Sequence, residues 1–257
     1  MFDQLGLIAL GFAAGILGSM IGLGGGIIVV PVLTFFGYSP TLAASSSLLA
    51  AFSNAVASTF SYSRQKRIEF SLGLKLGLLT IPGTVLGAYV SSNVAPEIFK
   101  ILFGFVLIAS AIYIFVRKKI ENKKVNLSKQ MMVFSISASF FAGILSAFFG
   151  IGGGIIFVPL MVVGMGMMMK KAAPTSQLIL LFASFSGVIV HSLLGHSDFL
   201  IGGFLALGSF IGGLVGARLS VDIKERFLQI IVSVVIIAAA IKMFVDSLSD
   251  SWFLINN

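Results

Sequence analysis

The segment GILGSMIGLGGGIIVVP at residues 15–31 recurs as GILSAFFGIGGGIIFVP at residues 143–159, an offset of 128 without a gap. Every glycine of the first copy except Gly18 has a glycine at the equivalent position, and the final proline is also repeated. With one inserted residue the register continues at an offset of 129, where PGTVLGA at 82–88 aligns with IGGLVGA at 211–217. A repeat of this length indicates two homologous units. We therefore predict a first membrane repeat at 1–116, a basic linker at 117–129 and a second membrane repeat at 130–257.

The composition around these segments is that of a membrane protein. Of the 257 residues 58% are hydrophobic and only 10% are charged, whereas soluble domains carry about 25% charged residues. A water-soluble enzyme is thereby excluded. The chain has no cysteine, so a disulfide framework, a thiolate metal site and a cysteine nucleophile are excluded too. The sequence predicts an all-α polytopic protein that has the lipid bilayer as its surroundings.

Eight apolar runs are separated by short polar segments. Two of them hold 32 and 38 residues and are too long for one untilted helix, and each is interrupted by a GxGGG cluster, at 22–26 and 150–154. Because glycine inside a helix costs about 1 kcal/mol relative to alanine, we predict a break at each cluster. The runs lie at about 5–36, 42–62, 71–93, 98–116, 131–168, 172–194, 199–217 and 227–245.

The positions of the basic residues favour one relation between the two repeats. If each glycine-broken segment crosses the membrane once, nine loop Lys and Arg residues lie on one side and five on the other, which is a weak asymmetry. If each such segment enters and returns, the repeats are inverted and fourteen of the 17 basic residues lie on one side, as the positive-inside rule requires. We therefore expect two inverted-topology repeats, each with a glycine-broken helix pair plus three transmembrane helices. Whether the broken pair is re-entrant or fully spanning is left open.

This topology predicts a location. The protein would lie in the cell (plasma or inner) membrane as a multi-pass protein, with both termini outside and the linker in the cytoplasm. The net charge of +8 is explained by cytoplasmic loops, so we expect no nucleic-acid partner. A homo-oligomer is left open.

The glycine clusters are the candidate binding site. A backbone break inside hydrocarbon persists only where protein or a water-filled cavity surrounds it, and inverted repeats with interrupted helices are the layout of many secondary transporters. Free amides and the positive end of a helix that starts at the break suit an anion. We predict that a small anionic substrate is bound by Gly24, Gly25, Gly26, Gly152, Gly153, Gly154, Ser46, Ser47, Asn54, Thr175, Ser176 and Gln177.

Several alternatives accompany this prediction. The glycines could serve only close helix packing, which is our expectation for Gly73/Gly77, Gly83/Gly87 and Gly208/Gly212/Gly216. The short helices could begin at the glycines or at Pro31 and Pro159.

The titratable residues near the ends of the spans carry three further predictions. His191, the only histidine inside an apolar run, is a candidate for proton coupling, with a satisfied interfacial histidine as its alternative. Glu69 and Asp198 lie at equivalent positions and are predicted to cap the helices that follow them.

These residues together resemble the sulfite exporter TauE/SafE family of membrane proteins. The resemblance is carried by the two glycine-rich segments that end in proline, by AASSSL at 43–48 and AAPTSQ at 172–177, and by the PG and GA pairs within 82–88. It extends over about residues 5–245. It implies export of sulfite, sulfonates or related sulfur oxyanions. Gln177 and Ile211 depart from the family pattern, which expects a hydrophobic residue and a proline there.

Other classes of function have less support from the residues. An intramembrane enzyme would need paired carboxylates, a metal cluster or a Ser/Lys or Ser/His pair at depth, and the spans offer only His191. We therefore expect no enzyme, no cofactor and no metal. The prediction is a secondary transporter of small anions that works by alternating access, with an anion channel or a transporter of another small organic acid as the alternative.

Overall fold

The structure is a computed structural model that describes residues 3–91, 93–116 and 129–221, together with the isolated positions 234, 237, 238, 240, 241 and 245. Regular structure in these ranges is helical throughout. The elements are α1 (Gln4–Ile21), α2 (Gly26–Phe35), α3 (Pro40–Arg64), α4 (Phe70–Ser91), α5 (Pro96–Val116), α6 (Lys129–Phe149), α7 (Gly154–Pro159), the π-helical turn η1 (Leu160–Gly164), α8 (Met169–Leu193) and α9 (Phe199–Leu219). Apart from those isolated positions the predicted span at 227–245 lies outside the described residues, as does nearly all of the predicted linker.

The protein is a multi-pass membrane protein. Within the described residues, five helices are long and apolar enough to cross a bilayer, namely α1, α4, α6, α8 and α9. Helix α3 is as long as α8 but richer in serine and alanine. Its polar side chains are compatible with a membrane because most of them are buried inside the bundle.

Contacts between named residues fix the directions of the helices. Ser209 packs on Gly15 and Leu205 on Gly11, so α9 runs parallel to α1. Ser53 Oγ donates to Ala206 O and Gln65 Nε2 to Ala217 O, so α3 also runs this way.

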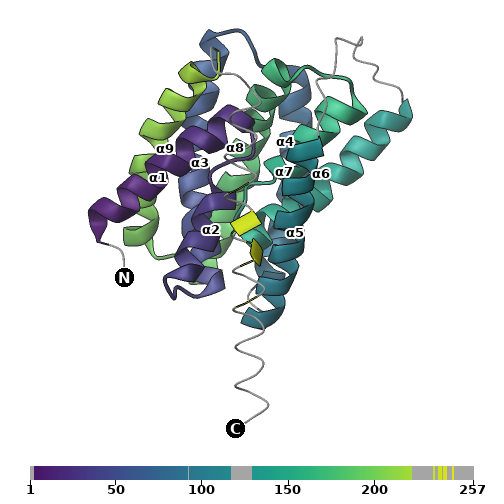
Figure 1. Cartoon of the computed structure of the whole chain (residues 1–257). Helices are drawn as coiled ribbons and strands as arrows, with labels where there is room; N and C mark the ends of the chain where they lie inside the picture. The colour runs from purple at the N-terminus through teal and green to yellow at the C-terminus, as the bar shows by residue number, and fades with distance from the viewer. Residues whose placement is uncertain are drawn as a thin grey trace.

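Helices α4, α6 and α8 run in the opposite direction. Gly83 meets Phe140 and Gly87 meets Ile144, which makes α4 and α6 parallel. Gly73 meets Leu178 and Gly77 meets Phe182, so α8 is parallel to them. Helix α8 is antiparallel to α3, because Ser58 lies beside Gln177 whereas Leu48 lies beside Gly187. Figure 1 shows α3 and α8 in the middle, α1 and α9 to one side, and α4 and α6 to the other.

Small residues allow the outer helices to approach closely. A methyl group on Gly208 or Gly212 would collide with the backbone of α1, and one on Gly83 or Gly87 would collide with the backbone of α6. The predicted packing role of these glycines is confirmed. The two helix pairs α1/α9 and α4/α6 therefore have the same design, with one backbone lying directly on another.

Both predicted breaks are present. Helix α1 ends at Gly22, which has a φ of 80° and donates its amide to Gly18 O. Helix α2 begins at Gly26, and α7 begins at Gly154 after Gly153, which has a φ of 84°. The short helices thus start at the glycines, and Pro31 lies inside α2 while Pro159 ends α7.

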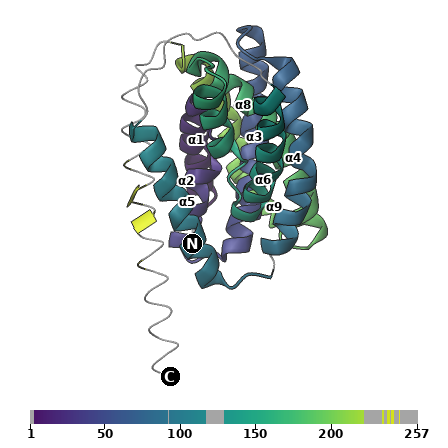
Figure 2. The same ribbon diagram turned by 90° about the vertical axis from the view of Figure 1, so that its right-hand side faces the viewer.

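Helix α2 turns back from the inner end of α1 toward the end of the bundle at which α1 begins (Figure 1). Eighteen residues give α1 a length of about 27 Å and ten give α2 about 15 Å. The first arm is therefore long enough to cross most of the hydrocarbon and the second only half of it. Figure 2 shows α5 at the edge of the bundle on the side opposite α4, where Phe99 and Phe103 stack on Phe148 and Phe149 of α6.

The described charges are divided unequally between the two ends. The end at which α3 and α9 terminate carries most of the basic residues, namely Arg64, Lys66, Arg67, Lys170, Lys171 and Arg218. The end at which α1, α3 and α9 begin has Asp3, Glu97, Lys100 and Asp198. We call the first of these the basic end.

Candidate functional site

The two glycine breaks lie directly against each other in the centre of the bundle. A methyl group on Gly26 would collide with Gly150 O, and one on Gly154 would collide with Gly22 O. These two contacts are equivalent under the offset of 128. All four glycines are buried. Glycine is therefore required at both positions for the breaks to meet.

A serine from each long central helix reaches the glycine break in the other half of the sequence. Ser47 Oγ donates to Gly150 O at 2.8 Å, and Ser176 Oγ donates to Gly22 O at 2.6 Å. The two serines are equivalent under the offset of 129, and both are fully buried. These bonds satisfy carbonyl groups that the breaks leave without a helical partner.

The first backbone amides of each short helix point out of its N-terminal end, toward the glycine break. In α2 the amides of Ile28 and Val29 bond to Gly25 O, and in α7 those of Ile156 and Phe157 bond to Gly153 O. The amides that precede them at a helix start have no intrahelical acceptor. The break between α1 and α2 thus offers backbone donors inside the protein.

Gln177 gives the first break a partner that the second break lacks. Its Nε2 donates to Gly18 O at 2.9 Å, and its Oε1 accepts from Ser58 Oγ at 3.2 Å. The equivalent pair under the offset of 129 is Leu48 and Gly187, which meet through apolar contact. The departure of Gln177 from the repeat is therefore matched by a departure at Ser58.

Three buried polar side chains on α3 and α6 have no partner in the described part of the chain. They are Ser46 and Ser146, through their hydroxyls, and Asn54, through both amide atoms. Ser146 lies beside Gly153 of the second break, whereas Ser46 and Asn54 lie against Gly202 and Gly213 of α9. Buried polar groups normally have a hydrogen-bond partner, so these three side chains can each form a hydrogen bond to a ligand.

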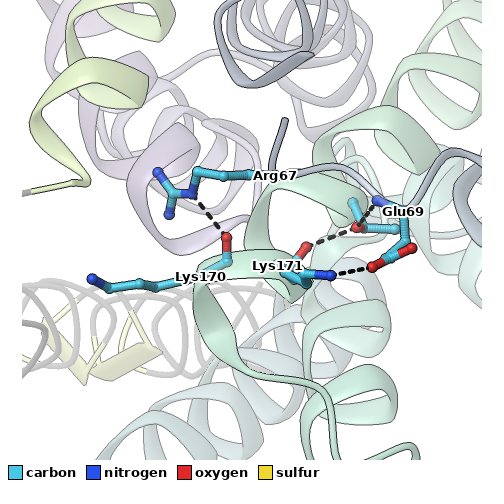
Figure 3. A network of polar contacts seen from close by, with 5 residues as sticks. Arg67, Glu69, Lys170 and Lys171 are labelled. Atoms are coloured by element: carbon cyan, nitrogen blue, oxygen red, sulfur yellow. Dashed lines mark hydrogen bonds and ion pairs between the residues drawn. The ribbon is translucent and has the colours of Figure 1, made fainter. Parts of the chain in front are cut away.

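Thr175 does not lie at the breaks with its neighbour Ser176. Its Oγ1 donates to Lys171 O at 2.7 Å and accepts from the Glu69 amide at 3.0 Å (Figure 3). It therefore connects the first turn of α8 to the start of α4, at the basic end.

The prediction that Glu69 and Asp198 are equivalent caps is right for only one of them. Asp198 Oδ1 accepts from the amides of Leu200 and Ile201 at the start of α9. The Glu69 carboxylate instead pairs with Lys171 Nζ, while Arg67 Nε donates to Lys170 O at 2.9 Å (Figure 3). The Glu69 carboxylate is thus held by Lys171, and the Glu69 amide separately donates to Thr175 Oγ1.

His191 is fully buried and has two polar neighbours. Its Nε2 lies 2.9 Å from Ala147 O, and its Nδ1 lies 3.1 Å from His196 Nδ1. Because a carbonyl oxygen accepts only, Nε2 carries a proton and the neutral ring accepts at Nδ1. His191 is thus held at the end of α8 away from the basic end.

Two buried residues that join the helices were not predicted from the sequence. Leu180 is buried, and its side chain lies against Gly24 and Gly152, one glycine from each break. Tyr62 donates to Ser19 O at 2.9 Å. The repeat contained a signal for both, since Leu180 is equivalent to Ala51, which also faces Gly152, and Tyr62 is equivalent to His191.

Comparison with known proteins identifies the family. The model of the sulfite exporter TauE/SafE family matches residues 7–243. The chain belongs to this family. Among its relatives are the probable membrane transporter proteins YunE of Bacillus subtilis, 29% identical over 94% of this chain and 97% of the relative, and MJ0441 of Methanocaldococcus jannaschii, 29% identical over 88% and 90%. YfcA of Escherichia coli K12 is 23% identical over 91% of this chain and 87% of its own length. No solved structure matches the chain significantly.

The TauE/SafE assignment agrees with the fold. The matched region contains both glycine breaks and all helices from α2 to α9. The polar side chains at the centre come from the uninterrupted helices, with Ser47 on α3 and Ser176 and Gln177 on α8, and they bond to backbone carbonyls at the ends of the interrupted helices.

Proposed function

We propose that this TauE/SafE protein is a secondary transporter of small anions, and that sulfite, a sulfonate or a related sulfur oxyanion is its substrate. The observation that carries the proposal is the meeting of two helix breaks inside a membrane bundle, because such breaks expose backbone donors where no water competes. The relatives are named as probable membrane transporters without a substrate. The sulfur oxyanion is proposed because the family is named a sulfite exporter family.

The proposal includes two inverted repeats. Its support is that the contacts come in equivalent pairs, such as Gly26 with Gly150 beside Gly154 with Gly22. Since α1 and α6 are equivalent and run in opposite directions, one unit would be the inverted copy of the other. The positive-inside rule then favours the basic end as the cytoplasmic one, with both termini outside.

The substrate would be bound by neutral donors. The described spans carry no Lys or Arg beside the breaks, so the candidates are the amides at the start of α2 and the unpartnered side chains of Ser46, Ser146 and Asn54. Dipoles and hydroxyl groups hold an oxyanion without an ion pair. Such moderate binding permits release on the other side.

Alternating access would use contacts at the two ends of α3 and α8. At the basic end the loop that carries Arg67 is held to Lys170 O, and at the other end Ser45 Oγ donates to His196 O at 2.8 Å. These two hydrogen bonds involve equivalent loops, since Arg67 and His196 are 129 residues apart. Release of one while the other persists would open a single side.

Binding is the experiment that tests this function. Purified protein would be screened by thermal shift against sulfite, sulfate, sulfonates and carboxylates. Ser46→Ala and Ser146→Ala remove hydroxyls that make no described hydrogen bond, so these variants should keep their melting temperature without ligand and lose about tenfold in affinity for the anion. Ser139→Ala is the matched control, because Ser139 Oγ donates to Ser135 O within α6.

The outcomes separate the candidate substrates. A shift with sulfur oxyanions that weakens in both serine variants supports the proposal. A shift with carboxylates alone would favour a transporter of another small organic acid, and unchanged affinities in both variants would refute the proposed site.

A further inference from the structure

A cavity of about 320 Å³ opens at the basic end between the last turns of α3 and α9, away from the glycine breaks. It is lined by Phe60, Ser61, Arg64, Gln65, Leu214 and Arg218. Two arginines on one small cavity would attract an oxyanion, and their planar guanidinium groups can bind a phosphate through paired hydrogen bonds.

The two arginines are available for such a ligand. Arg64 lies 4.3 Å above the Phe60 ring, which holds its guanidinium in place without using its N–H donors. Neither Arg64 nor Arg218 forms an ion pair with a carboxylate in the described ranges. Gln65 is already fixed, because it donates to Ala217 O and accepts from Arg67 Nη1. The cavity thus has a rigid wall and two cationic groups that have no carboxylate partner among the described residues.

The outward face of α9 continues from this cavity as an apolar stripe. Leu214, Ile211 and Leu207 follow Arg218 at spacings of four, three and four residues, which places them on one helix face. Ile211 is 54% exposed and Leu207 is 60% exposed. From Arg218 to Leu207 the helix rises about 17 Å, close to half of the hydrocarbon core of a bilayer.

A second cavity lies at the far end of this stripe. It measures about 380 Å³ and is lined by Phe199, Leu200, Gly203, Phe204 and Leu207. Leu207 therefore joins the stripe to a hollow whose lining carries no charged residue. A free ion would make no favourable contact with this apolar surface, whereas an acyl chain would pack against it.

We propose that the Arg64/Arg218 cavity binds the headgroup of an anionic phospholipid, whose acyl chain lies along Leu214, Ile211 and Leu207 of α9. The position at the basic end fits the leaflet in which anionic lipids attract basic groups. The lipid would bridge the ends of α3 and α9, two helices that also meet where Gly213 lies against Asn54, one of the proposed substrate ligands.

The test compares lipids on the purified full chain in a neutral detergent. Native mass spectrometry and thermal shift would be recorded with phosphatidylglycerol, phosphatidylcholine and inorganic phosphate. The variants are the double substitution Arg64→Gln/Arg218→Gln and the cavity-filling Leu214→Trp. Lys170→Gln is the control, since Lys170 is exposed at the same end and contributes only its carbonyl to the described contacts.

We expect wild type and Lys170→Gln to prefer phosphatidylglycerol over phosphatidylcholine by about tenfold or more. Both Arg64→Gln/Arg218→Gln and Leu214→Trp should lose that preference. If the double variant does not fold, Leu214→Trp alone tests the proposal, because it fills the cavity and leaves both arginine charges in place. A preference that survives in the folded variants overturns the proposal. So does an arginine-dependent shift with inorganic phosphate as large as that with the lipid, which would indicate a site for free anions.

Discussion

Tyr62 and His191 make the same hydrogen bond 129 residues apart. Tyr62 Oη donates to Ser19 O and His191 Nε2 lies on Ala147 O, both at 2.9 Å. The two acceptors are themselves equivalent under the offset of 128. A tyrosine does not titrate near neutral pH, so the shared role of the two residues is to hold α1 and α6 against the central helices. Proton coupling through His191 stays a prediction beside this positioning role.

The pair of histidines predicts how stability depends on pH. Burial lowers the pKa of His196 below its ordinary value of 6.5. Between that lowered pKa and 6.5 the folded protein therefore binds fewer protons than the unfolded chain, so stability rises with pH and is lost as pH falls below about 6.5. Melting temperatures from pH 5 to pH 8 measure this slope. His196→Gln keeps an amide that can donate to His191 Nδ1 and should flatten the slope, and an unchanged slope would contradict the prediction.

The contact between the breaks predicts an unusual sensitivity to one methyl group. Gly26→Ala and Gly154→Ala force a Cβ into the backbone of the opposite break, and each should cost about 3 kcal/mol. Thermal unfolding in detergent measures the loss. Gly203→Ala is the control, because a Cβ there meets nothing within 4 Å and should stabilise α9 by up to about 1 kcal/mol. Equal behaviour of the three variants would show that the breaks do not touch.

The equivalence of Ser47 and Ser176 predicts matched losses of stability. Each of Ser47→Ala and Ser176→Ala leaves a buried carbonyl of a break without its hydrogen bond, at a cost of about 1–3 kcal/mol. Both variants should therefore melt below wild type by similar amounts. A large loss in one and none in the other would mean that the two breaks are supported differently.

Cysteine labelling tests the inverted arrangement, and the chain has no native cysteine to interfere. Lys66→Cys at the basic end should react only from the cytoplasm, as should a cysteine at residue 122 of the linker. Ser197→Cys, in the loop before α9, should react only from outside. Labelling of Lys66→Cys and Ser197→Cys from the same side would refute the topology.

Much of this fold could be predicted from the sequence, because membrane helices and glycine breaks leave strong local signals. Within the described ranges the apolar runs predict the helices to within a few residues, and the GxGGG clusters mark both breaks, whereas the run at 227–245 stays a prediction. The offset of 128–129 also predicts which residues pair across the centre, as Ser47 and Ser176 do.

Side-chain placement is harder to predict, because the side chains of consecutive residues in a helix point in different directions. Ser176 and Gln177 reach the first break, whereas Thr175 connects to Glu69 at the basic end. The position of Glu69 before α4 predicts a cap, but its carboxylate pairs with Lys171, which lies about a hundred residues away in the sequence and gives no local signal. The filling of the centre by Leu180 follows from packing between two units, which no local pattern contains.

The most direct test of the central claim is transport of labelled sulfite into proteoliposomes that contain the purified protein. The account predicts uptake that saturates, is competed by other sulfur oxyanions and is accelerated by unlabelled sulfite inside the vesicles. Uptake that rises linearly with concentration and ignores sulfite on the far side would indicate a channel. No uptake of any sulfur oxyanion would contradict the account itself.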